Sequence, residues 1–199
     1  MALYLLNFIG IIIFLFLFWK RIKEDYISTQ IFTTSFGILL CILIGSIVSH
    51  MFAPSWWFWL EFLGVVTGLF LGIFRFRIRF FEVGEALVLS LLPWLSTIFL
   101  YDSVKNRNIY SYISFIFIIF MISLFYFLDA RYKKFSWYRS GRVGFSGGVV
   151  LCVFFLTRMI VALFIPTVLS FQGTYEAYLS GLVAISAGVV VFRLSRKLQ

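Results

Sequence analysis

Apolar residues in this chain occur in long runs, and the charged residues lie mostly between the runs. A run of about twenty apolar residues has the length of an α-helix that crosses the hydrocarbon core of a bilayer. Lipid offers backbone groups no hydrogen-bond partner outside the segment, so each run is interpreted as a helix. The pattern predicts seven transmembrane helices, at about residues 2–19, 31–52, 57–74, 84–101, 109–128, 145–170 and 178–192.

Composition supports a membrane protein. Hydrophobic residues make up 62% of the 199 residues and charged residues 13%, and the mean hydropathy is +1.03. Ordinary soluble domains are about half apolar and about a quarter charged. No linker rich in Pro, Gly or Ser divides the runs. We therefore expect an all-α integral membrane fold, a single domain over residues 1–199 built as a seven-transmembrane-helix bundle.

The basic residues predict the orientation of this bundle. Seven spans place fourteen of the seventeen Lys and Arg residues on one side, in the segments 20–25, 75–82, 129–144 and 193–199. The opposite side has only Lys105 and Arg107, and Arg158 lies inside a run. Basic residues favour the cytoplasmic side, so we expect an outside N-terminus and a cytoplasmic C-terminus. The net charge of +9 is assigned to this topology and to anionic headgroups rather than to nucleic acid.

The first run also predicts an outside N-terminus. Basic residues follow the run rather than precede it, and no A-x-A-like cleavage site stands before its charged flank. This is the pattern of a retained helix rather than of a cleaved signal peptide.

Arg158 is the basic residue that the topology does not explain. A helix over residues 145–170 would place it near the bilayer midplane, where an unpaired cation costs at least a few kcal/mol. One interpretation is a buried arginine held by helix-end carbonyls or by one carboxylate. The other is a site that holds a lipid headgroup or an anionic substrate. The sequence leaves both open.

Four further polar residues are expected near the outer ends of the helices, where together they would line an outward-facing pocket: His50, Glu61, Asp102 and Glu176. The alternative for each is a solvated residue at a helix end. On the inner side, Glu82 and Glu85 are expected to pair with arginines of the segment 75–79 as an interface anchor. The cluster at 56–59, rich in Trp, is interpreted as an interfacial aromatic belt, with a lid over an outward-facing lipid site as the alternative.

Motifs of soluble enzymes and metal sites are missing from the sequence. It contains no GxSxG, HExxH or P-loop pattern. Cys41 and Cys152 lie within apolar runs and have no metal-ligand spacing, so we expect no metal and no cofactor. Pro93 and Pro166 each raise the question of a helix kink, which the sequence leaves open.

The order of these features resembles the prolipoprotein diacylglyceryl transferases, bacterial seven-helix membrane enzymes. The residues that carry the resemblance are Trp19–Lys23 after the first run, Ile44-Gly45-Ser46, Phe62–Gly68, Phe80-Phe81-Glu82 within 75–86, Gly144–Arg158 and Tyr178-Leu179-Ser180. The resemblance implies a multi-pass protein of the bacterial cell membrane, whether inner or plasma membrane. It also implies phosphatidylglycerol as the lipid partner, a lipoprotein precursor as the second substrate, and lipid binding by Arg158.

Several residues depart from the family's pattern. Leu63 stands about where the family has a histidine, and the segment 96–102 has no arginine, asparagine or glycine. Ala162 replaces a glutamate one turn beyond the late arginine. Three functions therefore stay open: transfer of a diacylglyceryl group to a lipoprotein cysteine, a non-catalytic lipid-binding or assembly protein, and a small anion or lipid transporter.

Overall fold

The structure is a computed structural model that describes residues 2–131, 144–165, 168–171 and 173–195. Within these ranges the chain forms helices and no β-strand. The helices are α1 (Ala2–Ile22), α2 (Ser28–Phe52), the short 3-10 helix η1 (Pro54–Trp56), α3 (Trp57–Phe76), α4 (Phe80–Asn106), α5 (Ile109–Arg131), α6 (Phe145–Phe164) and α7 (Gly173–Ser195). Seven of these described helices, with η1 continuing into α3, are long and apolar enough to cross a membrane, which confirms the predicted all-α multi-pass bundle.

Two helices extend well beyond their predicted bounds. α4 covers 80–106 rather than 84–101, and α7 covers 173–195 rather than 178–192. Hydropathy marks where a segment leaves the apolar core, whereas helical hydrogen bonds continue through charged residues such as Glu82 and Lys105. The helices therefore project beyond the segment that hydropathy detects.

α6 is shorter than predicted, because it ends at Phe164 instead of residue 170. Ile165 has φ −135° and ψ 80°, outside the helical region, and the next residue in the sequence is Pro166. Proline disfavours the α conformation of the residue that precedes it. Pro166 itself, where the sequence left the question of a kink open, lies outside the described residues. Pro93, by contrast, lies within the continuous helix α4.

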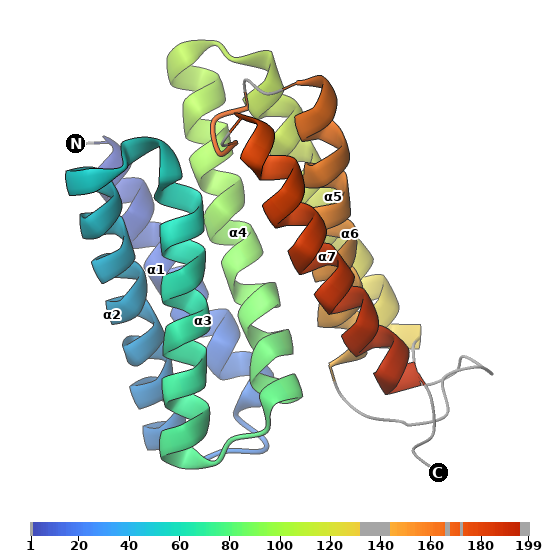
Figure 1. Cartoon of the computed structure of the whole chain (residues 1–199). Helices are drawn as coiled ribbons and strands as arrows, with labels where there is room; N and C mark the ends of the chain where they lie inside the picture. The colour runs from blue at the N-terminus through green and yellow to red at the C-terminus, as the bar shows by residue number, and fades with distance from the viewer. Residues whose placement is uncertain (1, 132–143, 166–167, 172, 196–199) are drawn as a thin grey trace.

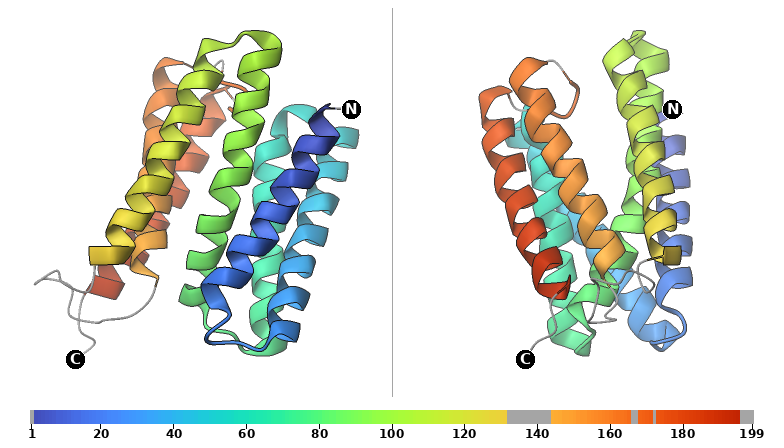
Figure 2. Two further views of the ribbon diagram at one scale, coloured as in Figure 1. Left: turned by 180° about the vertical axis from the view of Figure 1, so that it is seen from behind. Right: turned by 90° about the vertical axis from the view of Figure 1, so that its right-hand side faces the viewer.

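The helices pack around α4. α2 lies along α3 and α7 lies along α6, while α4 contacts α1 on one side and α5 and α6 on the other. Figure 2 shows α4 between the α1–α3 group and the α5–α7 group. We call the end with the α1–α2 and α3–α4 connections the basic end, and the end with η1 and the α4–α5 and α6–α7 connections the aromatic end. In Figure 1 the basic end is at the bottom.

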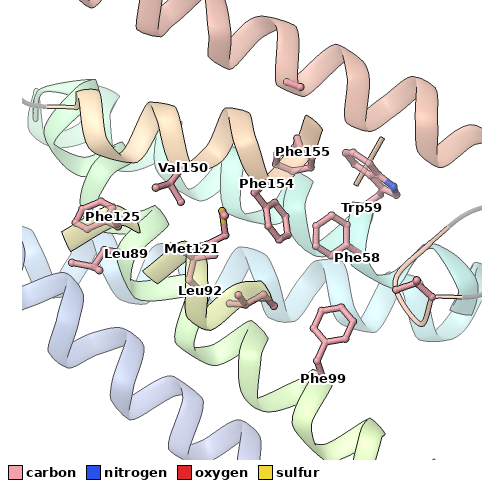
Figure 3. Packing of buried hydrophobic residues seen from close by; sticks show 13 residues of the cluster. Phe58, Trp59, Leu89, Leu92, Phe99, Met121, Phe125, Val150, Phe154 and Phe155 are labelled. Atoms are coloured by element: carbon pink, nitrogen blue, oxygen red, sulfur yellow. The ribbon is translucent and has the colours of Figure 1, made fainter. Parts of the chain in front are cut away.

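The buried apolar residues form two main clusters, and α4 contributes to both. Leu89, Leu92 and Phe99 of α4 join the cluster shown in Figure 3, which includes residues of α3, α5, α6 and α7. Val83 and Leu87 join a second cluster with residues of α1, α2 and α3. α4 thus connects the two halves of the bundle through opposite faces.

Glycines allow α2 and α3 to pack with their backbones in contact. Gly64, Gly68 and Gly72 recur every four residues along α3 and are buried. A Cβ atom added at Gly64 would lie 2.4 Å from the backbone oxygen of Cys41, and one at Gly68 would lie 2.6 Å from the Cα of Ile38. Small residues at this spacing are the usual device for close helix approach in lipid, where dispersion and packing hold helices together.

This contact predicts the effect of one added methyl group. Gly64→Ala should lower the thermal unfolding midpoint in detergent micelles, because overpacking a fitted contact costs about 1–3 kcal/mol. The matched control is Gly37→Ala on α2, where an added Cβ meets no atom within 4 Å. Equal midpoints for the two variants would contradict the close backbone contact.

Candidate functional site

Arg158 lies in a buried polar network near the aromatic end, and only 5% of its surface is exposed. Its guanidinium donates to Oε1 of Glu176 from Nε at 2.9 Å and from Nη2 at 2.7 Å. Nη1 donates to the hydroxyl of Ser170 at 2.8 Å, and Nη2 donates to the Ser170 carbonyl at 3.0 Å. The cation is therefore held by one carboxylate and by the connection between α6 and α7.

Glu176 extends the network to a third helix. Its carboxylate is fully buried in the first turn of α7. Oε1 also accepts from the Ser180 hydroxyl at 2.6 Å, one helical turn further along α7, while Oε2 accepts from Nε1 of Trp59 at 2.8 Å. Charge-assisted hydrogen bonds of this kind are about twice as strong as neutral ones. The network thus joins α3, α6 and α7 through one carboxylate.

Aromatic rings surround the Arg158 guanidinium. Its Cζ lies 3.8 Å from the ring centroid of Phe58 and 5.0 Å from that of Phe171. Figure 3 shows Phe58 and Trp59 beside Phe154 and Phe155, with rings from α3 facing rings from α6. These rings keep the ion pair from water and add cation–π attraction, which increases where the cation is desolvated.

The depth of Arg158 differs from the prediction. It stands thirteen residues after the start of α6 but only six before its end at Phe164. At 1.5 Å per residue, that is about 9 Å from the end of the helix. The midplane position assumed a helix over 145–170, and the shorter α6 moves Arg158 toward the aromatic end.

The four predicted pocket residues occupy separate surroundings, and no hydrogen bond described in the structure joins them to one another. Glu176 alone pairs with Arg158. Asp102 is buried at the α4–α5 turn, where it accepts from Asn106 at 2.7 Å and from Ser111. Glu61 is half-buried on α3, and His50 is exposed in the last turn of α2.

At the basic end, one part of the predicted anchor is confirmed. Glu82 pairs with Arg79 at 2.9 Å, as expected. Glu85 was expected to pair with the same arginine segment, and this was wrong, because its carboxylate instead binds Arg21 of α1 at 2.9 Å. Arg21 also pairs with Asp129 of α5 at 2.6 Å, and Glu85 accepts the backbone N–H of Gly144 before α6. This second network ties α1, α4 and α5 to the start of α6.

Sequence reasoning missed several members of both networks. Ser180 had a usable signal, since it follows Glu176 by one helical turn. Trp59 was interpreted as part of a belt, and its indole donor gave no indication of a buried partner. Arg21 and Asp129 are 108 residues apart, so their pairing depends on the packing of α1 with the α4–α5 hairpin.

The site consists of a neutral ion pair and four uncharged groups, namely the Trp59 indole, the Ser170 hydroxyl and carbonyl, and the Ser180 hydroxyl. Within the described ranges, no three His, Cys, Asp or Glu residues are grouped in a way that could hold a metal ion. No family model matches the chain, and neither a curated protein nor a solved structure matches it.

The pairing predicts non-additive effects of substitution. Arg158→Met should destabilise the protein by about 3–5 kcal/mol, because it leaves the Glu176 charge buried without a cation. The double variant Arg158→Met/Glu176→Leu should recover much of this loss, since neither charge then remains. Thermal unfolding in detergent of the two single variants and the double variant gives the coupling. Strictly additive losses would show that the two residues act independently.

Proposed function

We propose that this chain is a divergent, non-catalytic relative of the prolipoprotein diacylglyceryl transferases that binds phospholipid in a bacterial cell membrane, as a lipid-binding or assembly subunit. The sequence resemblance supports the relationship. Arg158 matches the family's late arginine, and its pairing with Glu176 supports the loss of transferase activity.

The pairing of Arg158 with Glu176 carries this proposal. Four hydrogen bonds from the guanidinium go to Glu176 and Ser170. A phosphate would have to displace a fully buried carboxylate that Trp59 and Ser180 also hold. The pair is electrically neutral, so it provides no net positive charge for a phospholipid phosphate or for a developing oxyanion.

Catalysis would also need a group that activates the lipoprotein thiol. The single histidine, His50, is exposed on α2 and has no described hydrogen bond to the network around Arg158. Glu61, half-buried on α3, likewise has no described hydrogen bond to that network. These positions disfavour transfer. They also disfavour a transporter with Arg158 as its anion site, because Glu176 already takes the place of the anion.

The same proposal includes the orientation with the N-terminus outside and the C-terminus in the cytoplasm. Exposed Lys20, Lys23 and Arg75 lie at the basic end, whereas Lys105 and Arg107 lie at the aromatic end. The excess of basic residues at one end supports a cytoplasmic basic end, with the network of Arg158 near the outer leaflet.

A lipid-transfer assay tests the absence of catalysis. Purified protein with phosphatidylglycerol and a lipobox peptide should give no lipidated peptide above the background without protein, for wild type and for Arg158→Lys alike. An active family enzyme in the same assay is the positive control. Product from wild type that is lost in a folded Arg158→Lys variant would overturn the proposal and establish the transferase.

Cysteine accessibility tests the orientation. Cys41 and Cys152 are first replaced by Ala, and a single cysteine is then introduced at Thr174 or at Lys23, both exposed. In intact cells an impermeant maleimide should label position 174 and leave position 23 unlabelled until the membrane is opened. The reverse pattern would invert the topology.

A further inference from the structure

Three arginines stand at alternate positions in the corner between α3 and α4. Arg75, Arg77 and Arg79 are exposed, whereas Ile78 between the last two is only 2% exposed. The buried isoleucine fixes this segment to the apolar core of the basic end. The corner therefore directs its cations outward from an anchored backbone.

Backbone hydrogen bonds hold the corner in place. Arg77 follows the last residue of α3 in the left-handed conformation, at φ 53°, and donates its N–H to the Ile73 carbonyl at 2.8 Å. Side-chain-bearing residues adopt this conformation infrequently, and glycine usually occupies such a position.

Tyr26, in the connection between α1 and α2, holds the backbone at Arg79. The hydroxyl of Tyr26 accepts the backbone N–H of Arg79 at 3.1 Å and donates to Glu82. Partial burial, followed by the hydrogen bond to Glu82, raises the pKa of Tyr26, so the hydroxyl keeps the proton that it donates. The α1–α2 connection thus holds the α3–α4 corner in one geometry.

The charge of the corner is only partly neutralised. Glu82 pairs with Arg79 at 2.9 Å. Among the described residues, neither Arg75 nor Arg77 forms an ion pair, and the Arg75 guanidinium lies 6.0 Å from the ring of Phe76. Two cations are therefore available to an anion from outside the protein.

Exposed phenyl rings precede and follow these cations along the chain, on α3 and α4. Phe70, Phe74 and Phe80 are 44%, 79% and 41% exposed. The ring of Phe70 lies 6.3 Å from that of Phe74 and 6.2 Å from that of Phe80, between centroids. The three rings therefore form a continuous exposed apolar surface on the helices that flank the corner.

We propose that this corner is a binding site for one anionic phospholipid of the adjacent leaflet. Arg75 and Arg77 bind the phosphate, and the acyl chains lie along Phe70, Phe74 and Phe80. Both parts are required, because a free phosphate would use the arginines and leave the phenyl surface without a partner. The inference rests on the proposed phospholipid binding but not on the proposed absence of catalysis.

Native mass spectrometry of the full chain tests the site. The protein is released from nanodiscs of equal phosphatidylglycerol and phosphatidylcholine, and retained lipid is counted. Arg75→Gln/Arg77→Gln should weaken phosphatidylglycerol retention by at least about tenfold, given the contribution of each basic residue near anionic lipid. Phe74→Ser should weaken it as well, without changing the net charge.

Lys105→Gln/Arg107→Gln is the matched control. It removes the same two charges from the opposite end, and Arg107, like Arg77, is exposed with a left-handed backbone, at φ 49°. Retention should stay near wild type in this variant, and thermal unfolding should show that all variants fold.

Results other than these would overturn either the proposed phospholipid binding or the proposed site at this corner. If wild type retains no phospholipid, the proposed phospholipid binding fails. An equal loss in both double variants would show that net charge, rather than this corner, attracts the lipid. Two results would show a free-anion site rather than a lipid site. One is that millimolar inorganic phosphate competes as effectively as added phosphatidylglycerol, and the other is that Phe74→Ser has no effect on retention.

Discussion

The burial of Arg158 is the constraint on which the aromatic end of the bundle depends. A guanidinium with 5% exposure inside a membrane protein must be paired, and the pairing determines the positions of three helices. Glu176 supplies the countercharge from α7, Ser170 adds a hydroxyl and a carbonyl, and Trp59 satisfies the second carboxylate oxygen from α3. Replacing such a pair with apolar residues is often neutral for stability, whereas removing one partner is costly. The main effect of the network is therefore to specify which helices pack together, and its net contribution to stability is small.

The basic end has a comparable arrangement with a different composition. Arg21 serves two carboxylates, Glu85 and Asp129, and its own side chain is 25% exposed. Because Arg21 and Asp129 are partly exposed, water can solvate the second carboxylate, which full burial would prevent. Polar networks thus join helices at both ends of the bundle, while apolar packing and glycine contacts join them in between.

Much of the fold could be predicted from the sequence, because span length and the distribution of basic residues act over single segments. The end of α6 was harder, since hydropathy continues past Phe164 and only the proline at 166 indicates that the helix stops. The site was partly predictable. Arg158 stood out because a cation in an apolar run needs a partner, and Glu176 was among the candidates. Their pairing with Ser170 could not be predicted, because it depends on the backbone path of the α6–α7 connection.

The spacing of the Arg158 pair along the chain has a consequence for how the protein enters the membrane. Arg158 and Glu176 are only 18 residues apart and belong to consecutive helices. The α6–α7 hairpin can therefore leave the insertion machinery with its buried arginine already paired when lipid surrounds it. Trp59 precedes Glu176 by 117 residues, so its helix α3 is synthesised before the hairpin that it contacts. The last two helices thus form a hairpin whose buried ion pair is complete within the hairpin itself.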